Sequence, residues 1–136
     1  MATVLYVDDD TGLGRLVHRW FERRGVTVVT ASSGAEARKH LRAHEIVGAF
    51  IDVWLGSETG FDLYAWIAEH RPRLRDRVVF ITGDIVPSVG QANEVQALGR
   101  TVLGKPFELT DLELHVRRWT APAPHPRRKS DPRPQP

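Results

Sequence analysis

The chain has 136 residues, of which 41% are hydrophobic and 26% are charged, and this composition is ordinary for one globular domain with a short appendage. It contains no cysteine, which excludes disulfide bonds and thiolate metal sites. Residues 121–136 contain four of the 19 basic side chains but only one of the 17 acidic side chains. Residues 1–120 are therefore close to neutral. The excess of basic residues, which could indicate a nucleic-acid partner, belongs to the end of the chain.

Short apolar runs alternate with amphipathic segments along the chain, and this alternation predicts strands and helices. In chain order, the expected elements are a strand at 3–7, a helix at 13–24, a strand at 26–30, a helix from Ser32 or Ser33 to about Ala43, a strand at 47–51, a helix at 61–70, a strand at 77–81, a helix at 85–99, a strand at 101–103 and a helix at 108–119. Pro87 and Gly90 both disfavour a helix near the start of the segment 85–99.

The first of these helices is amphipathic and has a stop signal in Gly25. Its expected apolar face comprises Leu13, Leu16, Val17, Trp20 and Phe21. The apolar run at 3–7 is too short for the core of a signal peptide, and no stretch approaches the ~18 consecutive apolar residues of a membrane span. We therefore predict a soluble, cytoplasmic protein.

Five strands joined by helical crossovers predict an α/β fold with a doubly wound, parallel (βα)₅ sheet. The runs at 26–30 and 47–51 are apolar or β-branched almost throughout, as expected for strands that are covered on both faces. We expect one domain over residues 1–120. Residues 121–136 contain six prolines and almost no apolar side chain, which predicts a disordered or polyproline-like basic tail.

Polar side chains follow four of the five expected strands. Three aspartates, Asp8, Asp9 and Asp10, follow the first strand, Asp52 the third, Thr82 the fourth and Lys105 the fifth. Because the carboxyl ends of parallel strands share one edge of a sheet, where ligands of open α/β sheets bind, these groups should meet there. Asp10 is assigned to capping the next helix.

This combination of side chains favours phosphoryl chemistry. Clustered carboxylates repel one another, and Mg²⁺, which prefers one or two carboxylates with water and phosphate oxygens, relieves that repulsion. An aspartate beside such a metal can act as a nucleophile and form an aspartyl phosphate. The metal, an ammonium and a hydroxyl then stabilise the charge of the transferring group. We predict this role for Asp52 with Mg²⁺, Thr82 and Lys105.

Four motifs, VLYVDDD, FIDVWL, VVFITGD and VLGKPFEL, resemble in order and spacing the signatures of two-component response-regulator receiver domains. The resemblance covers residues 3 to about 119 and implies a flavodoxin-like sheet with strand order 2-1-3-4-5. It also implies that Asp52 accepts the phosphoryl group. Asp9 would bind Mg²⁺ directly and Asp8 through water, with the carbonyl of Trp54 as a further ligand. The resemblance further implies a cis peptide bond between Lys105 and Pro106.

The chain departs from the family pattern at three places. The loop after Asp52 lacks the family's methionine–proline pair but keeps a final glycine, Gly60. The switch position on the fifth strand, usually an aromatic residue, is Val102, so a swinging ring cannot report phosphorylation. The bulky Trp54 occupies a position that in the family flanks the route of attacking water. We expect it to slow hydrolysis of the phosphorylated state; the alternative is that it narrows access for the phosphoryl donor.

The leading hypothesis is a signalling module, not an enzyme, that receives phosphate from a sensor histidine kinase or a phosphotransfer protein and then acts by contact with a downstream protein. No DNA-binding output domain is expected after residue 120. The resemblance implies weak pairing of two copies through the last two helices, which the weak helix signal at 85–99 does not support. One alternative is a receiver-like scaffold that works without phosphorylation, motivated by the altered loop and Val102. Another is a phosphatase of the haloacid dehalogenase type, against which the lack of an acidic pair after Lys105 on a later strand argues.

Overall fold

Five strands form one parallel sheet in the part of the chain that the computed structural model describes, residues 2–83 and 99–121. The strands are β1 (Thr3–Val7), β2 (Thr27–Ala31), β3 (Gly48–Asp52), β4 (Val78–Thr82) and β5 (Thr101–Gly104). They lie in the order β2-β1-β3-β4-β5, and all neighbouring pairs are parallel. The predicted α/β fold and its flavodoxin-like strand order are confirmed.

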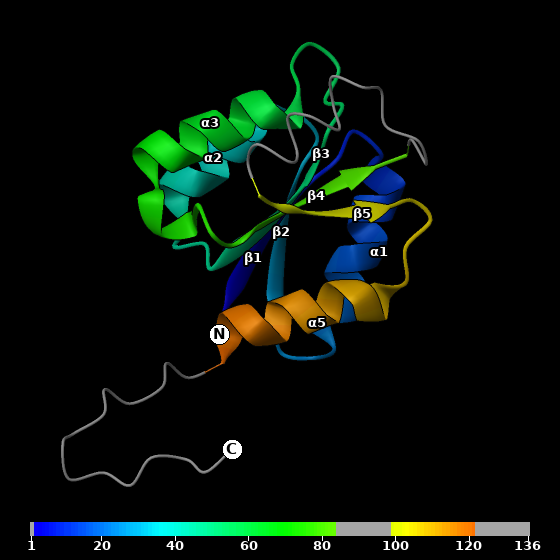
Figure 1. Cartoon of the computed structure of the whole chain (residues 1–136). Helices are drawn as coiled ribbons and strands as arrows, with labels where there is room; N and C mark the ends of the chain where they lie inside the picture. The colour runs from blue at the N-terminus through cyan, green and yellow to red at the C-terminus, as the bar shows by residue number, and fades with distance from the viewer. Residues whose placement is uncertain (1, 84–98, 122–136) are drawn as a thin grey trace, which may run out of the picture.

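Helices cover both faces of this sheet (Figure 1). The described helices are α1 (Thr11–Glu22), α2 (Gly34–Ala43), α3 (Gly60–His70), the short 3₁₀ turn η1 (Pro72–Leu74) and α5 (Leu109–Thr120). The cyan and green helices α2 and α3 lie on one face, and the blue and orange helices α1 and α5 lie on the other (Figure 1). The predicted helix at 85–99 lies outside the described residues up to residue 98, and so does the predicted tail from residue 122 onward.

Two buried clusters follow from this layering, because successive side chains of a strand point to opposite faces. Leu5, Val7 and Ile51 pack into the cluster on the side of α2 and α3. Val4, Tyr6 and Phe50 pack into the cluster on the side of α1 and α5. All positions of β3 and β4 are buried, which explains why these strands read as continuous apolar runs.

Strands β2, β3 and β4 each begin and end one residue later than the sequence predicts, and β5 ends one residue later. The ladder continues through Asp52, which pairs in register with Ile81, and through Thr82, which pairs with Gly104. Backbone pairing does not depend on side-chain polarity, so the change from apolar to polar residues does not mark the last residue of the strand. Asp52 and Thr82 therefore belong to the rigid sheet.

The helix starts are set by capping side chains. Asp10 caps α1 through a 3.1 Å hydrogen bond from the Leu13 amide, as predicted, and Ser33 caps α2. Along α1, Val17 and Phe21 are buried, but Leu16 is 52% exposed. The prediction that Leu16 faces the core was wrong. Val17 and Phe21 lie at the centre of the buried face of the helix, and Leu16 lies at its edge.

At the opposite end of the sheet, Trp119 of α5 packs directly on Gly48. A Cβ atom at position 48 would occupy the space of the indole ring. The guanidinium of Arg77 donates to the carbonyl oxygen of Trp119 at 3.2 Å and so fixes the last turn of α5. None of the described helices has the length and apolar character needed to cross a bilayer.

Candidate functional site

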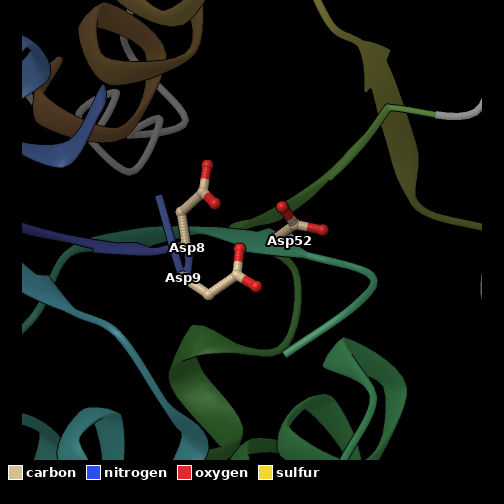
Figure 2. Close-up of side chains that lie close together, drawn as sticks. All are labelled: Asp8, Asp9 and Asp52. Carbon is tan, nitrogen blue, oxygen red and sulfur yellow. The ribbon is translucent and has the colours of Figure 1, made fainter. Parts of the chain in front are cut away.

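Three carboxylates lie together at the carboxyl edge of the sheet (Figure 2). Asp8 and Asp9 follow β1 directly, and Asp52 is the last residue of β3. One oxygen from each of the three lies within 4.8 Å of the others. The register between Val7 and Ile51 places the next residues of the two strands side by side, so the parallel sheet itself brings the acidic groups together.

Two of the three carboxylates are buried. Asp8 is 3% exposed and Asp52 is 5% exposed, whereas Asp9 faces solvent. Burial of a charged group is costly unless it is paired and hydrogen-bonded. The partners of the two buried groups therefore determine what the site can bind.

Lys105 is the charged partner of both buried carboxylates. Its Nζ atom lies 2.8 Å from Oδ2 of Asp8 and 2.9 Å from Oδ2 of Asp52. The residue follows β5, and its amide donates to the carbonyl oxygen of Thr82 at 2.7 Å. The peptide bond between Lys105 and Pro106 is cis, as predicted. The side chain thus reaches from β5 past β4 to the acidic groups of β1 and β3.

Asp8 has further hydrogen bonds that the sequence interpretation did not include. The phenolic hydroxyl of Tyr6 donates to Oδ2 of Asp8 at 2.9 Å, and the amide of Asp10 donates to its Oδ1 at 3.0 Å. Tyr6 precedes Asp8 by two residues, so the period of the strand places both side chains on the same face. That spacing was the signal in the sequence that could have identified Tyr6.

Asp52 has fewer donors than Asp8. Its Oδ2 accepts a hydrogen bond from Nζ of Lys105, and its Oδ1 accepts a 2.9 Å hydrogen bond from the amide of Trp54. Burial raises the pKa of both carboxyl groups, and hydrogen bonds from Lys105 oppose that effect. The additional donors at Asp8 leave its pKa below the ordinary value, whereas the pKa of Asp52 is raised.

The charge balance of this site favours a further cation. Burial lowers the pKa of Lys105, but its bonds to Asp52 and Asp8 outweigh that effect and raise it, so the amine stays protonated. One ammonium faces three carboxylates that lie within 4.8 Å of one another. Oxygen ligands at this spacing with excess negative charge suit a hard divalent ion such as Mg²⁺.

The loop between β3 and α3 is compact. The Gly60 amide donates to the Val53 carbonyl oxygen at 2.8 Å, and Trp54 forms an antiparallel bridge with Thr59. A Cβ atom at position 60 would collide with the carbonyl oxygen of Asp52, which explains why this loop keeps its final glycine. The Trp54 residue is 50% exposed and lies two residues beyond Asp52.

Thr82 is buried at the end of β4, the strand between β3 and β5. Because Asp52 pairs with Ile81, Thr82 lies one residue nearer the carboxyl edge on the neighbouring strand. The structure therefore brings Asp8, Asp9, Asp52 and Lys105 into one cluster. It places Trp54 in the adjoining loop and Thr82 on the adjacent strand at the same edge.

Comparison with known proteins agrees with this arrangement. A family model described as a response regulator receiver domain matches residues 4–117. The transcriptional regulatory protein GltR of Pseudomonas aeruginosa is 31% identical over 118 residues, which are 85% of this chain and 47% of GltR. The chain thus spans about half the length of that relative.

Two solved structures are similar in fold and in sequence. The chemotaxis protein CheY4 of Vibrio cholerae is 27% identical with a TM-score of 0.74, over 87% of this chain and 98% of CheY4. A response regulator protein from Burkholderia pseudomallei is 26% identical with a TM-score of 0.73, over 85% of this chain and 66% of that chain. The Burkholderia structure contains a phosphorylated aspartic acid, a calcium ion and citrate.

Proposed function

Because this chain belongs to the response regulator receiver domains of two-component systems, we propose that it accepts a phosphoryl group on Asp52 and signals by changing its contacts with other proteins. Receiver domains are signalling modules, not enzymes that turn over a free substrate. One observation carries the proposal. Asp52 is buried at the end of a central strand, with an ammonium 2.9 Å from one oxygen and two further carboxylates in the same cluster.

In the proposed reaction, a carboxylate oxygen of Asp52 attacks the phosphorus of a phosphohistidine on a kinase or phosphotransfer protein. The new O–P bond forms as the P–N bond breaks, and the imidazole leaves with the electron pair of the broken bond. Lys105 would pair with one phosphoryl oxygen, and the hydroxyl of Thr82 would donate to another. Thr82 ends β4, the neighbour of the strand that contains Asp52, and Lys105 follows β5, the next strand in the sheet. These positions support the assignments.

Asp9, Asp52 and the carbonyl of Trp54 are the proposed direct ligands of Mg²⁺, and Asp8 would bind through water. The bound ion would neutralise charge on the phosphoryl oxygens. The excess of three carboxylates over one ammonium supports this assignment. The presence of a phosphorylated aspartic acid and a calcium ion in the Burkholderia structure is consistent with it.

We further propose that residues 1–120 form the receiver and that residues 121–136 form a proline-rich basic tail of a cytoplasmic protein. Its partners would be a histidine kinase or phosphotransfer protein and a downstream protein, with weak pairing of two copies. Val102 packs on the cluster beside α2 and α3. Because Val102 has no aromatic ring, the change that passes the signal to a partner cannot be the rotation of a ring at that position.

The test is labelling by acetyl phosphate with and without Mg²⁺, followed by mass spectrometry of peptides. We expect Mg²⁺-dependent phosphorylation of Asp52 and none in the Asp52→Asn variant. Modification of Asp8 in its place would favour a phosphatase of the haloacid dehalogenase type. A folded protein that remains unmodified by acetyl phosphate and unchanged by beryllofluoride would support the scaffold alternative, which Val102 and the altered loop favour.

A further inference from the structure

We propose that Arg38 and Glu58 form a clamp that positions the loop between β3 and α3 for metal binding. The inference rests on the proposed function, because it concerns the same metal site. Arg38 belongs to α2, and Glu58 belongs to the loop that also contains Trp54. The clamp therefore joins a helix on one face of the sheet to the loop that contributes a proposed ligand.

The ion pair has a specific geometry. The Nη1 atom of Arg38 lies 2.9 Å from Oε1 of Glu58, and its Nη2 atom lies 3.0 Å from Oε2. The side chains are 22% and 23% exposed. Two parallel hydrogen bonds between a planar guanidinium and a carboxylate fix orientation as well as distance, which a single exposed contact does not.

The first turn of α2 is shaped to admit the Glu58 carboxylate. Gly34 is the first residue of α2, and a Cβ atom there would occupy the position of the Glu58 side chain. The guanidinium of Arg38 also lies 5.9 Å from the ring of Trp66 on α3. The Glu58 side chain thus lies against the first turn of α2, and Arg38 lies near α3 as well as Glu58.

Two buried apolar side chains, Val53 and Leu55, anchor the near end of the loop in the core. Leu55 is buried, and its amide donates to the carbonyl oxygen of Glu58 at 3.1 Å. Between Asp52 and Leu55, Trp54 is 50% exposed, so its side chain does not fix the backbone. Glu58 fixes the far end of the loop to α2, and Val53 and Leu55 fix the near end to the core. Trp54 lies between Val53 and Leu55, and its backbone pairs with that of Thr59, the residue after Glu58.

If the clamp is removed, the backbone of Trp54 should lose part of its fixed position, although Val53, Leu55 and the capped start of α3 keep the loop folded. Groups that orient metal ligands typically change affinity by about 10- to 100-fold when they are removed. Glu58 acts through the backbone and not by contact with a ligand, so we expect the lower end, about tenfold. Arg38 and Glu58 are positioning residues in this inference, not ligands.

The experiment is Mg²⁺ titration of the full chain by isothermal calorimetry, for the wild type, Glu58→Gln, Arg38→Gln and the double variant. Glu113→Gln is a matched control, because Glu113 also binds an arginine, Arg117, at 2.7 Å with a side chain that is 21% exposed, but on α5. Urea unfolding of each variant measures stability separately. We expect each single variant to bind Mg²⁺ about tenfold more weakly, the double variant to match the singles, and the control to match the wild type.

The outcomes separate the two proposals. Equal affinities in the wild type and both single variants would overturn the clamp and leave the proposed function standing. An equal loss in Glu113→Gln would also overturn it, since the effect would then follow general destabilisation. A wild-type protein that does not bind Mg²⁺ would overturn the metal site itself. If one single variant fails to fold, the other single variant provides the same comparison.

Discussion

The hydroxyl of Tyr6 donates a 2.9 Å hydrogen bond to Oδ2 of Asp8 inside the protein, where Tyr6 is 1% exposed and Asp8 is 3% exposed. Burial is the largest cause that raises the pKa of Tyr6, and the charge of Asp8 raises it further. The phenol therefore stays protonated and remains a donor. The same hydrogen bond helps to lower the pKa of Asp8, although Lys105 contributes more.

Replacing Tyr6 with phenylalanine removes only this donor. Hydrogen bonds to charged groups contribute roughly 1.5–3 kcal/mol, so we expect Tyr6→Phe to lower the free energy of unfolding by about that amount at pH 7. The folded pKa of Asp8 is below 3.8, so the stabilisation is present above that pH and is lost as the pH falls through the folded value.

Tyr64→Phe is the matched control for urea unfolding of this variant. The Tyr64 hydroxyl donates at 3.1 Å to a neutral acceptor, the carbonyl oxygen of Arg75. Its loss should cost roughly 0.5–1.5 kcal/mol and should not depend on pH in the acidic range. Equal losses in the two variants at all pH values would contradict the assigned role of Tyr6.

Lys105→Met should destabilise the protein strongly without Mg²⁺. The substitution leaves the carboxylates of Asp8 and Asp52 buried without a counter-charge, and breaking a buried pair in this way costs about 3–5 kcal/mol. A divalent ion at the same carboxylates should restore part of the loss. Thermal unfolding with and without Mg²⁺ measures both effects, and exposed Lys39→Met provides a control that should change neither.

The stability of the domain should rise with pH through the titration of His115. Burial lowers the pKa of His115, and the nearby charge of Arg118 lowers it further, while Asp111 opposes both. The unfolded chain therefore binds a proton at a higher pH than the folded one. Stability increases as the pH rises from the folded pKa to the unfolded value near 6.5 and is constant above it.

Urea midpoints between pH 5 and 8 test this expectation. His115→Gln should reduce the rise in stability, and Arg118→Gln should reduce it partly, since it removes only one of the two causes that lower the pKa. Unchanged pH profiles in both variants would show that other histidines determine the dependence.

Trp54→Asn should shorten the lifetime of the phosphorylated protein. The half-exposed indole lies two residues beyond Asp52, and a small polar side chain there would admit water more readily. The decay of phosphorylated Asp52 after removal of acetyl phosphate measures the lifetime. Trp20→Phe on α1 is a control with a tryptophan outside the site and away from Arg38, and an unchanged lifetime in Trp54→Asn rejects the idea.

The strands and the acidic cluster could be predicted because they depend on local sequence. Apolar runs mark β3 and β4, and parallel pairing then brings their ends to one edge. The limits of the strands could not be predicted to the residue, because Asp52 and Thr82 continue the ladder with polar side chains. Leu16 shows the same difficulty on a helix, where periodicity alone did not locate the edge of the buried face.

Some contacts between side chains that are distant in the sequence could not be predicted. Lys105 was expected near Asp52, but its equal approach to Asp8 depends on how a long side chain crosses β4. The pairing of Arg38 with Glu58 joins residues 20 positions apart and depends on the conformation of a loop. The sequence shows many arginines and glutamates, and nothing local indicates which of them meet.

The sharing of Lys105 has a consequence for the moment of phosphoryl transfer. The lysine ammonium has three N–H donors and directs two of them at Asp8 and Asp52, so a phosphoryl oxygen can accept from the third or take the place of Asp8. The Tyr6 hydroxyl and the Asp10 amide do not move with it, and they leave Asp8 with two donors. Lys105 can therefore move from Asp8 to a phosphoryl oxygen while the Asp8 carboxylate keeps hydrogen-bond donors.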